Sequence, residues 1–197
     1  MPVTARSVAV IGGGLMGRGI SARLALRGLD VAVVEPDIAT AALVRDEAVV
    51  GRRLATLEGA VTDADIVIEA ITEHAPTKRN VWRRVSATAR PDAVLATNTS
   101  SLSIDDLARE VAFPERFAGM HWFTPADLIP CVEIVRGAVT SDETIAALTA
   151  LAQGAGKAPV VVADSPGFVA NRLQFALLAE ALRCVEEGIA TPAQIDE

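Results

Sequence analysis

A cluster of glycines between a short apolar run and a helical pattern constrains this chain more than any other feature. Residues 7–12 are rich in β-branched side chains and predict a buried strand. Gly12, Gly14 and Gly17 then form the pattern G-x-G-x-x-G, and apolar residues recur at helical spacing over 15–28. Glycine costs backbone entropy, so a strand, this turn and a helix in that order indicate that something approaches the backbone closely.

The turn has the features of a dinucleotide-binding site. The first glycine permits the sharp turn, the second lets a pyrophosphate touch the backbone, and the third lets helix and strand pack closely. The first residues of the helix, Leu15 and Met16, would present N–H groups to the anion. A second strand is expected over 31–35, and the carboxylate of Glu35 would accept hydrogen bonds from the adenosine ribose and repel a 2′-phosphate. We therefore predict NAD as the cofactor rather than NADP; a tight turn without a ligand is the alternative.

Strand and helix patterns alternate along the rest of the chain. Further strands are expected over 64–70, 93–98, 117–122, 131–135 and 159–163, and helices over 37–51, 76–89, 104–111, 141–153 and 168–187. This alternation predicts an α/β fold with a Rossmann-type, doubly wound and mostly parallel sheet. We assign residues 1–164 to this NAD-binding domain and 165–197 to the incomplete beginning of an all-helical domain.

Composition and charge argue against several kinds of partner. The formal net charge is −7 at pH 7, which opposes binding to nucleic acid or to an anionic membrane. The apolar run at the N-terminus is far shorter than a membrane span of about 20 residues, and no charged leader precedes it. Cys131 and Cys184 lie far apart without metal-ligand spacing. We therefore expect reduced thiols, a cytoplasmic protein and no metal site.

The catalytic groups are expected at the carboxyl ends of the strands, where ligands bind in sheets of this kind. The chain has two histidines. His74 lies in a polar segment where a helix begins and is expected to be solvated, whereas His121 lies near the end of the predicted strand 117–122. Taken alone, His121 could equally be a core residue with its hydrogen bonds satisfied.

The chain resembles the 3-hydroxyacyl-CoA dehydrogenase family in four segments that occur in the family's order. These segments are IGGGLMGRGI, ATNTSSLSI, FAGMHWFTPADLIPCVEIV and DSPGFVANRL. The resemblance implies an NAD-dependent oxidoreductase of fatty acid metabolism that interconverts a 3-hydroxyacyl thioester and its 3-oxo form, and it implies a homodimer. It assigns catalytic roles to Ser100, His121, Glu133 and Asn171. It also places three residues near the ribose and nicotinamide ends of the cofactor: Glu73, Lys78 and Asn98.

The roles that the resemblance implies agree with what the reaction needs. Oxidation of a secondary alcohol needs a base for the hydroxyl proton, and His121 suits this role because histidine exchanges protons near neutral pH. Glu133 would hold the other ring N–H and stabilise the imidazolium. Ser100 and Asn171 would hydrogen-bond the substrate oxygens. Each residue also has a plain structural interpretation; Ser100, for example, could cap the helix over 104–111.

The chain departs from the family's pattern in three places. Thr124 stands where relatives usually carry Asn, so the side chain keeps a hydroxyl but loses the amide's paired donor and acceptor. A single helix over 37–51 fits where acyl-CoA enzymes carry a long helical hairpin that contacts the CoA nucleotide. The helical domain stops after its first helix, which is apolar on most sides, so we expect either a fragment or a partner chain that covers this helix.

These departures leave the substrate open. An acyl thioester, linked to CoA or to a carrier protein, is one class, and a small free hydroxy acid is another. A catalytically idle nucleotide-binding protein on the same scaffold is the alternative from outside the enzymes.

Overall fold

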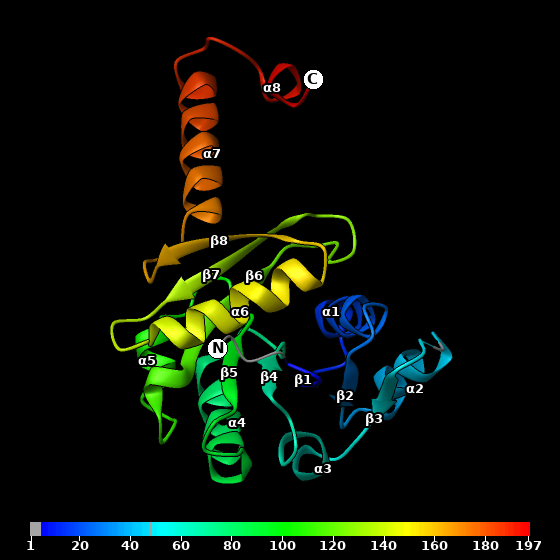
Figure 1. The fold of residues 1–197 in the computed structure, drawn as a ribbon. Helices are drawn as coiled ribbons and strands as arrows, with labels where there is room; N and C mark the ends of the chain where they lie inside the picture. The colour runs from blue at the N-terminus through cyan, green and yellow to red at the C-terminus, as the bar shows by residue number, and fades with distance from the viewer. Residues whose placement is uncertain (1–4, 48) are drawn as a thin grey trace.

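An eight-stranded sheet forms the centre of the computed structural model, which describes residues 5–47 and 49–197. Its strand order is β3-β2-β1-β4-β5-β6-β7-β8 (Figure 1). The strands are β1 (Ser7–Ile11), β2 (Asp30–Val34), β3 (Arg52–Leu54), β4 (Ile66–Glu69), β5 (Val94–Thr97), β6 (Phe117–Trp122), β7 (Cys131–Arg136) and β8 (Ala158–Ala163). Only the β6–β7 pair is antiparallel among these strands. The predicted Rossmann-type, mostly parallel sheet is confirmed.

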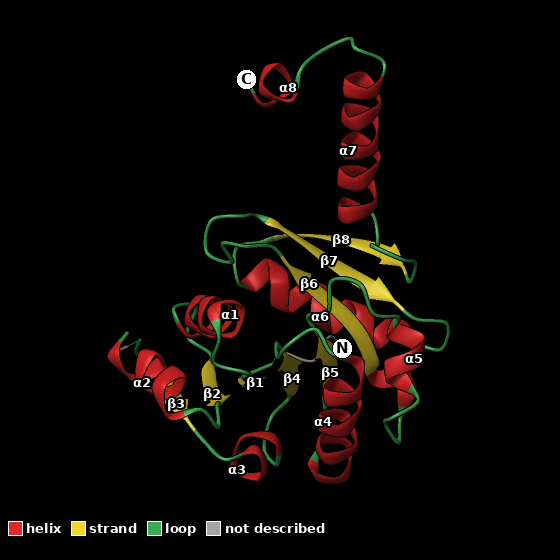
Figure 2. Cartoon of the chain, turned by 180° about the vertical axis from the view of Figure 1, so that it is seen from behind, coloured by secondary structure: helices red, strands yellow, loops and turns green. Residues whose placement is uncertain are grey.

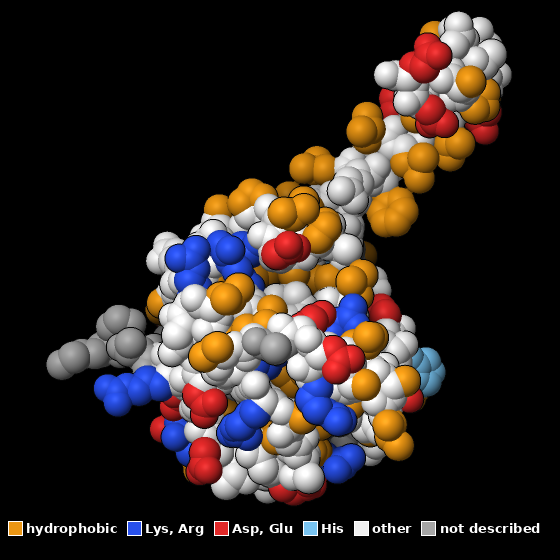
Figure 3. Space-filling view, turned by 90° about the vertical axis from the view of Figure 1, so that its right-hand side faces the viewer, with side chains coloured by type: hydrophobic (Ala, Val, Ile, Leu, Met, Phe, Trp, Pro, Cys, Tyr) orange, Lys and Arg blue, Asp and Glu red, His pale blue; other side chains and the backbone are white. Residues whose placement is uncertain are grey.

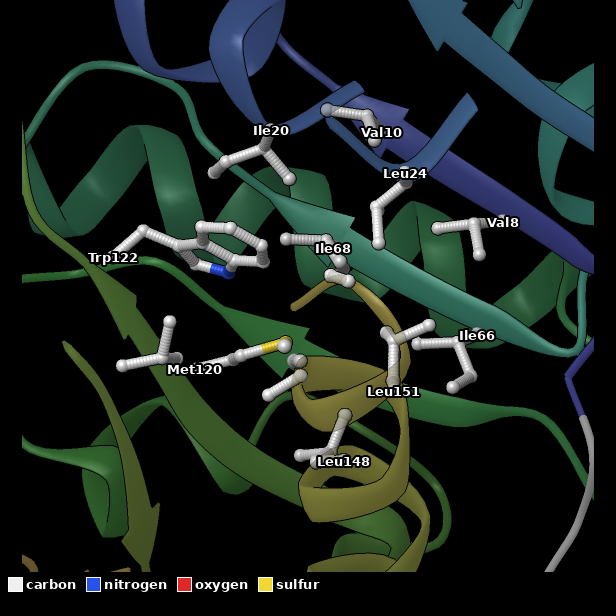
Figure 4. Close-up of a cluster of buried hydrophobic side chains, with 14 of the residues drawn as sticks. Val8, Val10, Ile20, Leu24, Ile66, Ile68, Met120, Trp122, Leu148 and Leu151 are labelled. Atoms are coloured by element: carbon white, nitrogen blue, oxygen red, sulfur yellow. The ribbon is translucent and has the colours of Figure 1, made fainter. Parts of the chain in front are cut away.

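Helices cover both faces of the sheet. They are α1 (Leu15–Ala25), α2 (Ile38–Asp46), α3 (Leu57–Val61), α4 (Ala75–Thr88), α5 (Ile104–Ala108), α6 (Asp142–Gly154), α7 (Ala170–Glu186) and α8 (Pro192–Asp196), with a 3₁₀ turn at Pro114–Arg116. One core lies under α1 and α6 and includes Ile20 and Leu24 of α1 and Leu148 and Leu151 of α6 (Figure 4). The other core lies under α3, α4 and α5. The strands β1, β4, β5 and β6 between the two cores are buried on both faces, which agrees with their largely apolar sequences, whereas β8 is mostly exposed.

The segment after β2 differs from the helix predicted over 37–51. Asp37 caps α2 by accepting a hydrogen bond from the Thr40 N–H at 2.8 Å, but the helix ends at Asp46. Gly51 has a φ of +83°, and the chain then forms β3 beside β2. The helix is therefore shorter than predicted, and the left-handed Gly51 lies between its end and β3; residue 48 lies outside the described residues.

Helix α5 is shorter than predicted and excludes the alternative interpretation of Ser100 as its cap. Its N-cap is Ser103, whose hydroxyl accepts a hydrogen bond from the Asp106 N–H, and Ser100 is not the cap. The helix ends at Ala108, before the predicted residue 111. Ser100 is thereby left in the loop between β5 and α5, where it is available for another role.

Helix α7 extends away from the sheet (Figures 1 and 2). None of its residues is buried, and the large apolar side chains that it exposes are Leu173, Phe175, Leu177, Leu178 and Leu182. Figure 3 shows apolar side chains along this projection. In the described part of the chain, no helix combines the length and the apolar character needed to cross a bilayer. The domain division into 1–164 and 165–197 stays a prediction.

Candidate active site

The glycine turn lies where β1 meets α1, and its three motif glycines have different surroundings. Gly12 has a φ of +106°, and a Cβ there would lie 2.5 Å from the carbonyl oxygen of Ala70. A Cβ at Gly17 would overlap the carbonyl oxygen of Gly12. A Cβ at Gly14 would have no atom within 4 Å. Packing therefore requires glycine at the first and third positions, whereas Gly14 faces open space, as a backbone that binds a pyrophosphate must.

A cavity of about 770 Å³ opens beside this turn. Gly12 and Gly14 line it, together with Glu35 at the end of β2 and apolar side chains such as Leu57 and Ile71. Glu35 Oε2 accepts a hydrogen bond from the Gly13 N–H at 2.7 Å, which fixes the carboxylate in the cavity wall. Apolar walls, the carboxylate of Glu35 at the end of β2 and an exposed glycine backbone fit the adenosine and pyrophosphate of a dinucleotide.

His121 and Glu133 form a buried pair. The imidazole Nδ1 of His121 lies 2.8 Å from Oε2 of Glu133, and the two residues are 3% and 2% exposed. A carboxylate at this distance assigns the ring proton to Nδ1 in the neutral imidazole, so Nε2 is left as an acceptor. Nε2 has no hydrogen bond to any residue in 5–47 or 49–197. The pair can therefore accept a proton at Nε2.

The second oxygen of Glu133 is bound by the start of α7. Oε1 accepts hydrogen bonds from the backbone N–H groups of Val169 at 3.0 Å and Ala170 at 2.9 Å. Asn171, one residue further along, donates from Nδ2 to the carbonyl oxygen of Ser100 at 3.2 Å. The structure thus brings Glu133, Asn171 and Ser100 together at the base of α7, as the sequence predicts.

Glu73 holds the loop that carries Ser100. Its Oε1 accepts hydrogen bonds from the hydroxyls of Thr99 and Ser101 and from the backbone N–H groups of Ser100 and Ser101. Burial raises the pKa of the Glu73 carboxyl, but these donors and the charge of Lys78 outweigh burial, so the pKa lies below its usual range. Glu73 is therefore held as a carboxylate by its neighbours.

Lys78 is buried, with 1% of the residue exposed. Its Nζ lies 2.6 Å from Glu69 Oε1 and 3.4 Å from Glu73 Oε2. Glu69 also accepts a hydrogen bond from the Thr97 hydroxyl at 2.7 Å. Sequence reasoning missed Glu69 and Thr97. The available signal was a glutamate within the apolar strand sequence over 64–70.

The remaining predicted residues lie along the same edge of the sheet. Asn98 Oδ1 accepts a hydrogen bond from the Trp122 N–H at 2.9 Å and so joins the ends of β5 and β6. The Thr124 hydroxyl donates to Met16 Sδ at 2.9 Å, which places Thr124 against the start of α1. Leu15 is exposed there. His74 is exposed at the start of α4 and contacts Thr77, as its expected solvation implies.

Comparison with known proteins gives matches over most of the chain. The family model of the 3-hydroxyacyl-CoA dehydrogenase NAD binding domain matches residues 7–58 and 45–165, and that of the C-terminal domain matches residues 167–197. A 5-formyl-3-hydroxy-2-methylpyridine 4-carboxylate 5-dehydrogenase from Mesorhizobium japonicum is 36% identical, over 97% of this chain and 68% of the relative. A probable 3-hydroxybutyryl-CoA dehydrogenase from Bacillus subtilis is 38% identical, over 98% of this chain and 74% of the relative.

A solved structure gives the same result. The crystal structure of (S)-3-hydroxybutyryl-CoA dehydrogenase from Ralstonia eutropha matches with a TM-score of 0.90 at 34% identity, over 98% of this chain and 75% of that one. The matched domain is an NAD-binding domain and the relatives are dehydrogenases, which confirms the predicted cofactor and the predicted class of enzyme. The chain belongs to the 3-hydroxyacyl-CoA dehydrogenase family.

Proposed function

We propose that this protein interconverts a 3-hydroxyacyl thioester and its 3-oxo form, with His121 and Glu133 acting as the general base. The observation that carries the proposal is the buried contact of 2.8 Å between His121 Nδ1 and Glu133 Oε2. NAD, when bound, supplies the acceptor for the hydride of the carbinol carbon. His121 Nε2 takes the hydroxyl proton, so that the alcohol becomes a ketone.

Glu133 makes the protonated state of His121 tolerable. A buried imidazolium without a partner would be costly, and the carboxylate at 2.8 Å supplies the opposite charge. The carboxylate is in turn stabilised on its other oxygen by the N–H groups of Val169 and Ala170. Both charges therefore have partners once the proton has moved.

Ser100 and Asn171 would position the substrate. The Ser100 hydroxyl has no hydrogen-bond partner among the described residues, so it is available to a substrate oxygen. The bond from Asn171 Nδ2 to the Ser100 carbonyl joins the β5–α5 loop to α7 at 3.2 Å. These two polar side chains would fix the carbinol group in front of His121.

A small free hydroxy acid is the second candidate substrate, because the Mesorhizobium japonicum relative, which is 36% identical, is named for a pyridine carboxylate. The alignments with this relative and with the Bacillus subtilis relative both extend over 213 positions, more than the 197 residues of this chain, so chain length does not separate the two substrate classes. The family model of the NAD-binding domain matches in two pieces that overlap at 45–58. We infer that residues which relatives carry near 45–58 are absent here.

Two of the three arginines in this segment have partners, and the third, Arg45, is exposed. The Arg52 side chain is 1% exposed and contacts Glu47 and the Val44 carbonyl, and Arg53 lies 3.7 Å from Asp30. A CoA phosphate would need free lysine or arginine side chains. The thioester proposal therefore extends to substrates without the CoA nucleotide, including carrier-protein thioesters.

A substrate panel tests the proposed function. NADH formation is measured with the full-length protein for 3-hydroxybutyryl-CoA, its carrier-protein and N-acetylcysteamine thioesters, and free 3-hydroxy acids. Turnover with any thioester supports the first candidate, and turnover with free acids alone supports the second. NAD binding without turnover of any compound would support an idle nucleotide-binding protein. A homodimer, which the exposed apolar side chains of α7 support, and a cytoplasmic location stay predictions.

A further inference from the structure

A tight turn leads into α7, and the residue that ends this turn, Phe168, has an unusual backbone conformation. Pro166 and Gly167 occupy its central positions, Gly167 has a φ of +75°, and the Phe168 N–H donates to the Ser165 carbonyl at 2.9 Å. A proline followed by a left-handed glycine is typical of a type II turn. The turn is therefore readable in the sequence, but the conformation of the residue after it is not.

Phe168 continues the left-handed backbone with a φ of +51°. In the described ranges it is the only residue other than glycine with a positive φ. A bulky side chain disfavours this conformation, which persists only where the surroundings impose it. Its ring supplies that constraint, because Phe168 is 1% exposed and its ring centroid lies 5.6 Å from that of His121.

The left-handed backbone at Phe168 sets the direction of the next two N–H groups. Those of Val169 and Ala170 both point at Glu133 Oε1, at 3.0 and 2.9 Å. A residue with ordinary φ at position 168 would turn these N–H groups elsewhere. The Glu133 carboxylate would then be held only through Oε2, by His121, because Oε1 would lose its two N–H donors.

We propose that Phe168 is a positioning residue for the reaction, acting through its backbone conformation. The buried ring holds the left-handed φ, this φ aims two N–H groups at Glu133, and Glu133 holds the His121 ring in place. The inference rests on the function proposed above for His121 and Glu133. It extends that site to a residue which the mechanism itself does not use.

A pair of variants separates backbone conformation from loss of packing. Phe168→Ala and Phe168→Gly both remove the ring, but alanine opposes a positive φ and glycine does not. Turnover of 3-hydroxybutyryl-N-acetylcysteamine, or of another substrate that the panel identifies, is measured in the full-length protein. We expect Phe168→Ala to lower kcat about tenfold or more and Phe168→Gly to be several-fold faster than Phe168→Ala, with the Kd for NAD unchanged in both. A purely structural role predicts the opposite order, because alanine fills more of the space and is less flexible.

A third variant leaves the Phe168 ring in place. Gly167→Ala would add a Cβ with contacts of 3.5 Å at the closest, which is ordinary packing, but it opposes the φ of +75°. We expect a lower kcat and an unchanged Kd for NAD. If Phe168→Ala does not fold, which thermal unfolding reveals, Gly167→Ala decides: normal kcat overturns the proposal.

Two outcomes distinguish this inference from the function on which it rests. If His121→Ala keeps its turnover, the proposed base is wrong, whatever the Phe168 variants do. If His121→Ala loses turnover but Phe168→Gly is no faster than Phe168→Ala, only the role of Phe168 is overturned. In a His121→Ala background, the difference between the two Phe168 variants should disappear.

Discussion

His121 and Glu133 lie directly opposite each other on β6 and β7, the one antiparallel pair in the described sheet, and their side chains meet at 2.8 Å. Residues opposite each other in a ladder project from the same face of the sheet. The reversal of β7 therefore places the carboxylate beside the imidazole. A slip of one residue in this register would move Glu133 to the other face, so the contact depends on strand pairing as well as on residue type.

Replacement of His121 should affect turnover far more than cofactor binding. We expect His121→Ala to lower kcat by about 10² to 10⁴-fold, the usual contribution of a positioned base, with the Kd for NAD nearly unchanged. His74→Ala is the matched control, because His74 is exposed at the start of α4. Steady-state kinetics and NAD titration of both variants provide the test, and near-normal kcat in His121→Ala contradicts the proposed base.

Replacement of Glu133 should have a smaller effect. In Glu133→Gln an amide oxygen can still accept from the His121 Nδ1–H, but the charge that stabilises the imidazolium is lost. A hydrogen bond to a charged group is worth roughly 1.5–3 kcal/mol, so we expect kcat to fall about 10- to 100-fold, less than for His121→Ala. A Glu133→Gln variant as slow as His121→Ala would show that the carboxylate does more than support the ring.

The motif glycines predict a contrast between binding and stability. Gly14→Val places its side chain in open space, where the pyrophosphate would lie, so it should abolish NAD binding without lowering the melting temperature. Gly17→Ala would overlap the Gly12 carbonyl, so it should destabilise the fold. Thermal unfolding and NAD titration of the two variants test this. Equal loss of stability in both would mean that the space at Gly14 is not open.

The fold and the site were predictable from sequence to different degrees. Strands such as β4 and β5 consist mostly of apolar residues. The run of apolar residues along the sequence is enough to predict where these strands lie. β3 has three residues, Arg52–Leu54, and exists because it pairs with β2. The sequence RLAT over 53–56 indicates a strand-like piece, but it does not identify β2 as the partner, and the helix predicted over 37–51 ends earlier, at Asp46.

The site residues that sequence reasoning missed also depend on contacts between distant parts of the chain. The resemblance to the 3-hydroxyacyl-CoA dehydrogenase family pointed to His121 and Glu133, which sequence pattern alone did not separate from core residues. Glu69 and Thr97, the partners of this site beside Lys78, were not predicted, because burial of a charge is tolerable only with partners and Thr97 lies 28 residues from Glu69. From sequence alone, a glutamate and a lysine of this kind cannot be told from surface residues, because only the fold brings them into contact.

Glu73 should give the stability of the protein a small acid dependence. Its pKa is lowered in the folded state from 4.5, so the carboxylate contributes stability above that value, and the contribution is lost as pH falls through the folded pKa. The side chain is 38% exposed, so solvent screening keeps the effect below about 1 kcal/mol. Melting temperatures of Glu73→Gln and the parent protein should converge as pH falls below 4.5. A gap that is constant or widens toward low pH would contradict this assignment.

The short segment between β2 and β4 predicts how the protein treats the CoA nucleotide. Contacts to a remote part of a substrate can lower the barrier at the reacting carbon. For an enzyme that uses contacts to the CoA nucleotide, kcat/KM therefore falls when the nucleotide is removed from the substrate. Here α2 ends at Asp46 and Arg52 is already engaged by Glu47 and the Val44 carbonyl.

We therefore expect 3-hydroxybutyryl-N-acetylcysteamine to retain kcat/KM within about a hundredfold of 3-hydroxybutyryl-CoA in the full-length protein. Comparison of the two esters at limiting substrate measures the difference as a free energy. A loss above about 2.7 kcal/mol, roughly a hundredfold, would mean that the protein binds the nucleotide, through the exposed Arg45 or through residues outside the segment between β2 and β4.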